Sequence, residues 1–335
     1  MESTGYIRFT SNISQNKMTK MFKIILSLSL IVLLTYGCNQ SGQQQYTDTP
    51  TYGEIKIASD ETLVPICNYE IQVFEGIYQY AKITPLYYPE RDAFKALLDD
   101  SVRLILAARK LSKKEEDFFT AKKIYPRQRE IALDGVALII HPSNNDSMLS
   151  VSTLKDILTG HIQRWEQINK KSRLGKIQVV FDNPASSTVR FAMDSITKGE
   201  AFASNLSALD YNKDVIDYVS RNTNALGIIG VSWVSDKTDS TCLSFLKKVK
   251  VVALSKEKEA NYDNSYKPFQ AYIKNKSYPL TRSIYVINAE PRQGLASGFA
   301  AFVASYRGQL IILKSGILPT TQPVNVRTVE VKNDY

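Results

Sequence analysis

Histidine and cysteine are scarce in this 335-residue chain, which contains two histidines and three cysteines. Neither type occurs at the short spacings that metal sites use, so the sequence predicts no metal site. No Gly-x-Ser-x-Gly turn is present, which disfavours a hydrolase built on a nucleophile elbow. The weaker alternative is a nucleophilic Ser186 or Ser187 with His141 or His161 as its base. We therefore expect neither an enzyme nor a cofactor.

Basic side chains are in excess but do not form runs, and the formal net charge is +9. No basic stretch interleaved with aromatic residues and no nucleic-acid motif is present, so we expect no nucleic-acid partner. A scattered positive excess suits a protein that meets anions. The same positive excess is equally compatible with a solvent-exposed surface that does not bind any particular partner.

Long apolar runs are lacking apart from 24–34, which follows three lysines near the N-terminus. This run is shorter than the roughly 20 residues of a membrane-spanning helix but has the length of a signal sequence. A small residue, Gly37, precedes Cys38 directly after it, as in a bacterial lipoprotein signal. We predict a signal peptide over 1–37 and lipidation of Cys38, with plain secretion as the alternative. Met18 or Met21 would be a more ordinary start for such a signal.

The segment after Cys38 is polar, rich in glutamine and without periodicity, which predicts a flexible tether over 38–53. The remaining chain has a globular composition, with 44% hydrophobic residues over the whole sequence, and no internal repeat. Cys67 and Cys242 lie far apart in it. Separately buried thiols are favoured over a disulfide between them.

Strand-like and helix-like segments alternate from residue 54 onward, which predicts a mostly parallel sheet covered by helices on both faces. A long extended apolar run over 131–140 has the character of a crossing between two domains. The expected strands are 54–58, 83–88, 102–107, 131–140, 177–180, 226–231, 250–254 and 278–287. The expected helices follow the turn at 59–62 and cover 91–98, 112–119, 154–160, 186 onward, 215–219, 295–305 and 307 onward.

Two strand-to-helix turns carry hydroxyl groups where anions bind most readily. The stretch 181–191 leaves an apolar strand and starts a helix at Ser186, Ser187 and Thr188, and the turn at 59–62 presents Thr62 in the same way. The first N–H groups of a helix lack partners inside the helix, and the helix dipole is positive there. An ordinary Ser or Thr N-cap is the alternative interpretation of each turn.

The ordered set of segments resembles the substrate-binding proteins of bacterial phosphate ABC importers and covers nearly the whole chain after Cys38. The segments that carry the resemblance are IASDETLVPI (57–66), LDGVALIIHP (133–142), LKDILTGHIQRW (154–165), SSTVRF (186–191), ALGIIGV (225–231), YPLTRSIYVI (278–287) and FAAFVASYRGQLIILKSGILP (299–319).

This resemblance implies an α/β fold of the two-lobed periplasmic binding protein type II class, with mostly parallel sheets joined by hinge-crossing strands. The expected division of the chain is a signal peptide over 1–37, a tether over 38–53, lobe 1 over 54–135, lobe 2 over 136–280, a return to lobe 1 over 281–320 and a tail over 321–335. The anion would lie in the cleft between the lobes.

The resemblance also implies a set of ligand-binding residues: Thr62, Leu63 through its backbone N–H, Arg109, Ser186, Ser187, Thr188 and Arg190. Arg190 has an alternative role as the partner of Asp194 in an outward ion pair. The chain departs from the family at four places. Ser187 replaces a glycine, Ala108 a serine and Asp182 an arginine, and the Gly-Ser loop expected near 88–91 is missing.

As a member of this family, the protein would capture phosphate or a similar tetrahedral oxyanion on the periplasmic side of a bacterial membrane. It would be anchored by lipid and would deliver the anion to an ABC transporter permease. The alternative is a lipoprotein that keeps the fold and uses it for sensing or assembly without transport.

Overall fold

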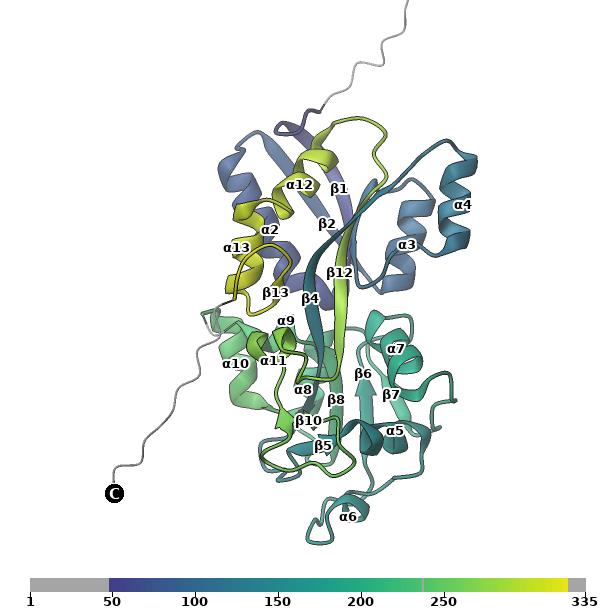
Figure 1. The fold of residues 1–335 in the computed structure, drawn as a ribbon, viewed down its shortest axis with the longest axis vertical. Helices are drawn as coiled ribbons and strands as arrows, with labels where there is room; N and C mark the ends of the chain where they lie inside the picture. Colours follow the sequence, from purple (N-terminus) through teal and green to yellow (C-terminus); the bar gives the residue numbers. More distant parts are fainter. Residues whose placement is uncertain (1–47, 237, 325–335) are drawn as a thin grey trace, which may run out of the picture. The chain divides into compact units, whose positions relative to one another are not determined.

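The computed structural model describes residues 48–236 and 238–324, and the predicted signal peptide with Cys38 lies outside them. A ten-stranded sheet dominates these residues, and two long strands, β4 and β12, run through its middle (Figure 1). We call the part built on the first half of β4 lobe 1 and the part built on its second half lobe 2. The two-lobed α/β fold expected from the sequence is confirmed.

Lobe 1 has the strand order β2-β1-β3-β12-β4, with β13 paired to β4. The β1 strand is parallel to β2 and β3, whereas β12 is antiparallel to both β3 and β4. Its strands are β1 (Gly53–Asp60), β2 (Ala81–Tyr88), β3 (Leu104–Ala107), β4 (Arg127–Ile140), β12 (Thr281–Asn288) and β13 (Leu318–Pro319). Its helices are η2 (Glu61–Leu63), α2 (Val64–Ile77), α3 (Glu90–Leu98), α4 (Lys113–Ala121), α12 (Leu295–Val303) and α13 (Tyr306–Lys314).

Lobe 2 continues the sheet in the order β4-β8-β6-β7 and adds a small three-stranded sheet, β11-β10-β5. Its strands are β5 (Met148–Ser150), β6 (Gln178–Phe181), β7 (Leu206–Ala208), β8 (Ala225–Gly230), β9 (Lys250–Val251), β10 (Ala253–Ser255) and β11 (Ser265–Tyr266). Its helices are α5 (Val151–Thr159), α6 (Trp165–Ile168), α7 (Ser187–Phe191), η3 (Ala192–Thr197), α8 (Asn212–Val219), α9 (Ser232–Ser235), α10 (Ser240–Lys248) and α11 (Gln270–Lys274).

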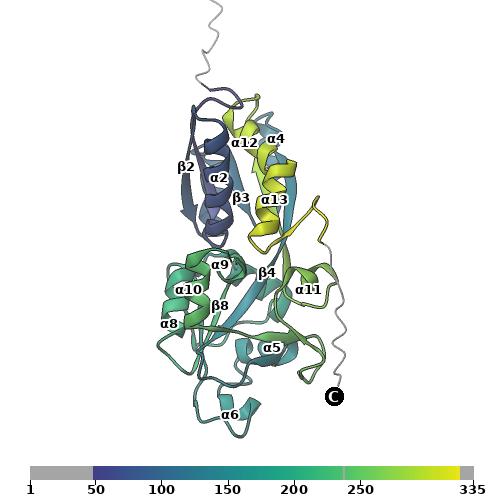
Figure 2. The same ribbon diagram turned by 90° about the vertical axis from the view of Figure 1, so that its left-hand side faces the viewer.

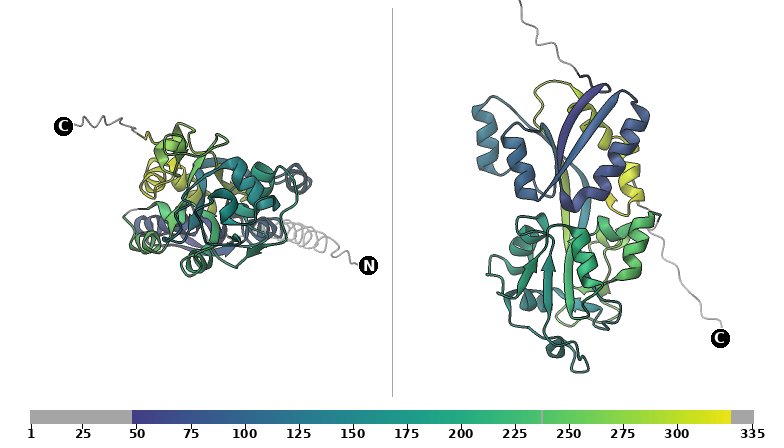
Figure 3. Two further views of the ribbon diagram at one scale, coloured as in Figure 1. Left: turned by 90° about the horizontal axis from the view of Figure 1, so that it is seen from below. Right: turned by 180° about the vertical axis from the view of Figure 1, so that it is seen from behind.

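Helices cover both faces of the lobe 1 sheet because neighbouring residues of a strand point to opposite faces. Ile57 of β1 packs into a core with Phe74 of α2 and Phe299 of α12, whereas the next residue, Ala58, packs with Phe94 of α3. Figure 2 shows α2, α12 and α13 together, and the rear view in Figure 3 shows α3 and α4 on the other side of the strands. The rings of Phe74 and Phe299 lie 5.4 Å apart in an edge-on contact.

Several local signals in the sequence are confirmed. Ser112 and Glu115 form the expected capping box, and Gly160 ends α5 with a left-handed φ of 86°. Cys67 and Cys242 are separate buried thiols, so the disulfide alternative is wrong. Within 48–236 and 238–324, no single helix has the length and apolarity to span a membrane, although the bent pair α12–α13 meets that test by length and composition.

Two expectations need correction. The single strand expected over 250–254 is divided, because β9 pairs with β4 whereas β10 pairs with β5 and β11. The tether expected over 38–53 is too long at its C-terminal end. Asp48 accepts a 2.7 Å hydrogen bond from the N–H of Leu295 and pairs with Arg292, so the chain is already held against α12 at residue 48.

Candidate functional site

A buried ion pair joins the two crossing strands at the junction of the lobes. Arg282 of β12 and Asp134 of β4 are direct partners in the strand register. The Arg282 Nε and Nη2 atoms lie 3.1 and 3.0 Å from Asp134 Oδ2, and the two side chains are only 2% and 0% exposed. Burial raises the pKa of Asp134, and the neighbouring guanidinium opposes that rise. The pair fixes a guanidinium at the point where the sheet passes from one lobe to the other.

Hydroxyl groups from the two lobes converge on this guanidinium. Arg282 Nη1 donates a 2.6 Å hydrogen bond to Ser187 Oγ of lobe 2, and Nη2 donates a 3.0 Å bond to Thr62 Oγ1 of lobe 1. The two hydroxyl oxygens are 3.2 Å apart. All three side chains are buried. A positive charge and two hydroxyl donors therefore share one location, which is a donor set suited to an oxyanion.

Thr62 is placed by the way β1 ends. Asp60 is the last residue of β1 and the N-cap of the short η2 helix, and its Oδ1 accepts a 3.0 Å hydrogen bond from the N–H of Thr62. The α2 helix follows at once, with Leu63 as its N-cap and a proline in its first turn. Thr62 directly precedes Leu63, so it lies at the positive end of this 14-residue helix. The side chain of Leu63 does not cap that end.

Ser186 and Thr188 turn away from Arg282 and toward Asp182. Ser186 Oγ accepts from the N–H of Val189, as an N-cap does, and donates a 2.7 Å bond to Asp182 Oδ1. Thr188 Oγ1 donates to the same carboxylate oxygen and lies 2.8 Å from Ser186 Oγ. The N-cap interpretation therefore describes Ser186, and Asp182 takes up the hydroxyls that an anion would otherwise contact.

Asn212, the first residue of α8, connects the acidic residues of both lobes. Its backbone N–H lies 3.2 Å from Glu61 Oε2, and its side-chain amide donates to Glu61 and, at 3.1 Å, to Asp182. The side-chain oxygen Oδ1 of Asn212 accepts a 3.0 Å bond from the N–H of Gly230. Asp60 Oδ2 is buried without a hydrogen-bond partner. A tetrahedral anion that carries a proton would supply the donor that such an oxygen lacks.

Burial raises the pKa of each carboxyl near the hydroxyl pair. Burial, followed by the charge of Glu90, raises the pKa of Asp60 to about 7. Burial likewise raises the pKa of Glu61 to about 8, against the two bonds from Asn212. Burial also raises the pKa of Asp182. The raised pKa values of Asp60 and Glu61 reduce their negative charge near pH 7 and so weaken their repulsion of an anion, while Asp60 keeps an ionised form that can accept a proton from the anion.

The stability of the ligand-free protein should decrease as the pH rises from about 5 to 8. A carboxyl with a raised pKa in the folded state holds its proton more tightly there than in the unfolded chain, so stability falls through the interval between the two pKa values. For Asp60 and Glu61 this interval runs from about 4 to about 8. Urea unfolding at several pH values would measure it, and Asp60→Asn should flatten the dependence. Stability that is level or rises over this range would contradict the assignment.

Arg109 and Arg190 contact carboxylates rather than the hydroxyl pair. Arg190 Nη2 lies 3.1 Å from Oε1 of the buried Glu90, and Nη1 lies 3.5 Å from Asp194. Arg109 forms two bonds of 2.8 and 2.9 Å with Glu115. Both arginines line a cavity of about 390 Å³ whose wall includes Ser186. The outward ion pair expected for Arg190 is present, but its closer partner is Glu90 of the opposite lobe.

The hydroxyl groups were expected from the sequence, whereas Arg282, Asp134 and Asn212 were not. The signal for the first two was available, because each is the single charged residue inside an apolar crossing segment, 278–287 or 131–140. Within the described residues, no group of three or more His, Cys, Asp or Glu side chains has an arrangement that could hold a metal ion.

Two α/β lobes joined by crossing strands, with polar groups from both lobes meeting at the junction, define a two-lobed binding protein. The profile of the PBP superfamily domain matches residues 44–307, and the chain belongs to this superfamily.

Proteins that are similar in sequence or fold support the same assignment. The chain is 24% identical over 296 residues to the phosphate-binding protein PstS of Pseudomonas aeruginosa, covering 83% of this chain and 86% of the relative. It is 23% identical over 308 residues to PstS of Staphylococcus aureus, covering 89% and 94%. A phosphate ABC transporter substrate-binding protein of Clostridium perfringens, solved with bound phosphate, shares the fold with a TM-score of 0.68 and 22% identity over 80% of this chain and all of that one. These are binding proteins, which confirms the expectation of a protein that is not an enzyme.

Proposed function

We propose that the protein captures phosphate, or a similar tetrahedral oxyanion, between lobe 1 (54–135 and 281–320) and lobe 2 (136–280) for an ABC importer. The observation that carries the proposal is the meeting of Thr62 and Ser187, from opposite lobes, at the buried guanidinium of Arg282. An anion that replaced their mutual contact would receive two hydroxyl donors and one charge. The names of the relatives, which are phosphate-binding proteins, support this choice of anion.

The buried carboxyls favour a protonated anion. Phosphate carries a proton near neutral pH and can donate it to an oxygen such as Asp60 Oδ2, which has no donor of its own. Sulfate carries no proton at this pH, so Asp60 Oδ2 would have no hydrogen-bond donor beside the bound anion. An unpaired buried group costs roughly 1 to 3 kcal/mol, so we expect phosphate to bind more tightly than sulfate.

Removing either hydroxyl should weaken phosphate binding. Thr62→Ala and Ser187→Ala each delete one donor, at a cost of about 1 to 3 kcal/mol, which is roughly a five- to 150-fold increase in Kd. Isothermal titration of each variant with phosphate measures the change. Ser244→Ala is the matched control, because this exposed serine of α10 bonds only within its own helix. Phosphate affinity equal to that of the wild type in both Thr62→Ala and Ser187→Ala would show that phosphate does not bind at the interlobe site.

Lipid anchoring is a second part of the proposal and rests on the sequence alone. The apolar run 24–34 and Gly37 precede Cys38, which would carry the lipid on the outer side of the membrane. Metabolic labelling with a palmitate analogue should mark the wild type and leave Cys38→Ala unlabelled. Equal labelling of the variant would exclude Cys38 as the anchor. Cys67→Ala serves as the control, because Cys67 is a buried thiol of the folded domain.

A role in sensing or assembly, without transport, is supported by one specific contact. Glu61 reaches across the lobe junction to Asn212 and occupies space among the polar groups of the proposed site. If this contact is permanent, the lobes stay closed on themselves. Wild-type protein that binds no oxyanion, and gains phosphate binding in Glu61→Ala, would favour this role.

A further inference from the structure

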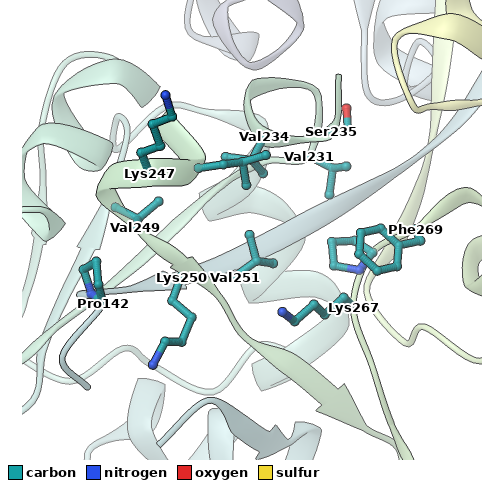
Figure 4. Close-up of a pocket in the computed structure, with 12 residues that line it drawn as sticks. Pro142, Val231, Val234, Ser235, Lys247, Val249, Lys250, Val251, Lys267 and Phe269 are labelled. Carbon is teal, nitrogen blue, oxygen red and sulfur yellow. The ribbon is translucent and has the colours of Figure 1, made fainter. Parts of the chain in front are cut away.

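Lobe 2 contains a second cavity, separate from the hydroxyl groups at the lobe junction. It has a volume of about 350 Å³ and lies between α9, α10, β9 and the segment that precedes α11 (Figure 4). Most of its wall is apolar, formed by Val231, Val234, Leu246, Val249, Val251 and Phe269. Apolar pockets of roughly 300 Å³ or more are the usual size of small-molecule sites.

The charges at this cavity are all of one sign. Lys247, Lys250 and Lys267 line it, and none of its lining residues within the described part of the chain is acidic. Lys250 Nζ donates a 2.7 Å hydrogen bond to the carbonyl oxygen of Asn144. Lys247 and Lys267 are both exposed, and among the described residues neither forms an ion pair or a side-chain hydrogen bond. In Figure 4 the Lys267 side chain extends from the segment of Phe269 toward Val251.

From the apolar wall and the unpaired ammonium group of Lys267, we propose that this cavity binds a free medium-chain fatty acid. The aliphatic chain would lie against the valines and Leu246, and the carboxylate would pair with Lys267, whose side chain extends toward Val251 in Figure 4. At about 30 Å³ per non-hydrogen atom, the share that a water molecule takes in the liquid, the cavity has room for roughly a dozen atoms. Decanoate, with ten carbons and two oxygens, matches this size.

The cavity wall is continuous with the groups behind the proposed anion site. Val231 and Pro268 flank Gly135 of β4, where an added Cβ would lie 3.0 and 3.4 Å from them. Ser232, which follows Val231, donates a 2.8 Å hydrogen bond to the carbonyl oxygen of Thr62. A fatty acid in the cavity would therefore contact the segment that supports Thr62.

Titration of the full-length protein with decanoate, decan-1-ol and acetate tests the proposal without any substitution. Decanoate should bind at one site per chain, decan-1-ol roughly tenfold more weakly because it lacks the charge, and acetate not detectably because it lacks the chain. Acetate binding as tight as decanoate would show a plain anion site and overturn the proposal. No decanoate binding, or equal binding of decanoate and decan-1-ol, would overturn it as well.

Lysine variants locate the site. Lys267→Gln should raise the decanoate Kd about tenfold or more, and Lys258→Gln, which changes an exposed lysine outside the cavity, should not. Thermal unfolding of each variant checks that it is folded. Decanoate affinity that is unchanged in Lys267→Gln would place the ligand elsewhere and overturn the assignment.

Discussion

Arg282→Gln is expected to abolish phosphate binding at concentrations that saturate the wild type. The guanidinium supplies the only buried positive charge that contacts Thr62 and Ser187 among the described residues. Charge-assisted hydrogen bonds contribute about 1.5 to 3 kcal/mol each, so the loss of two corresponds to at least roughly a hundredfold increase in Kd. The variant should also lose about 3 to 5 kcal/mol of stability, because Asp134 is left as an uncompensated buried charge.

A second substitution separates these two effects. Arg282→Gln combined with Asp134→Asn removes both charges, so it should recover much of the stability and none of the phosphate binding. Arg103→Gln is the matched control, because Arg103 is a half-exposed arginine that pairs with Asp100. Calorimetric titration measures affinity, and urea unfolding measures stability. Phosphate affinity within a few-fold of wild type in Arg282→Gln would show that the guanidinium does not contact the anion.

Gly230→Ala is expected to disrupt the same site by displacing Thr62. An added Cβ would lie 2.9 Å from the carbonyl oxygen of Thr62 and 3.2 Å from its Cβ, so the η2 turn would have to move. Overpacking of this kind costs about 1 to 3 kcal/mol, and a displaced Thr62 should weaken phosphate binding about tenfold or more. Urea unfolding and calorimetric titration would measure the two effects.

Gly76→Ala is the matched control, because an added Cβ at this position of α2 meets no atom within 4 Å. It should stabilise the protein by about 0.5 to 1 kcal/mol, since alanine is the better helix former, and leave binding unchanged. If Gly230→Ala matches Gly76→Ala in both measurements, Thr62 is not held against β8 as the structure places it.

Local sequence signals predicted the elements of the site more reliably than its chemistry. The strand-to-helix turns at Thr62 and Ser186 follow from short-range rules about apolar strands and capping side chains, and both are present. Which hydroxyl faces an anion and which faces a carboxylate depends on residues distant in the chain. Ser187 meets Arg282 from 95 residues away, whereas Ser186 bonds to Asp182 only four residues before it.

The arginine could not be chosen from the hydroxyl segments themselves. Arg190 lies one helical turn after Ser186, which made it a candidate, but Glu90 of lobe 1 holds its guanidinium. Arg282 is brought to the site by the pairing of β12 with β4, a contact between residues 148 positions apart. The sequence shows only that Asp134 and Arg282 are opposite charges, each isolated in an apolar strand. The register between β4 and β12 brings the two side chains together.

Calorimetric titration of the wild-type protein with phosphate and, in parallel, with sulfate at pH 7 tests the central claim most directly. We expect one phosphate per chain with a Kd well below millimolar, and sulfate at least about tenfold weaker, because sulfate has no proton for the buried carboxyls. Failure to bind any oxyanion at millimolar concentration would contradict the proposed oxyanion binding and favour a role in sensing or assembly.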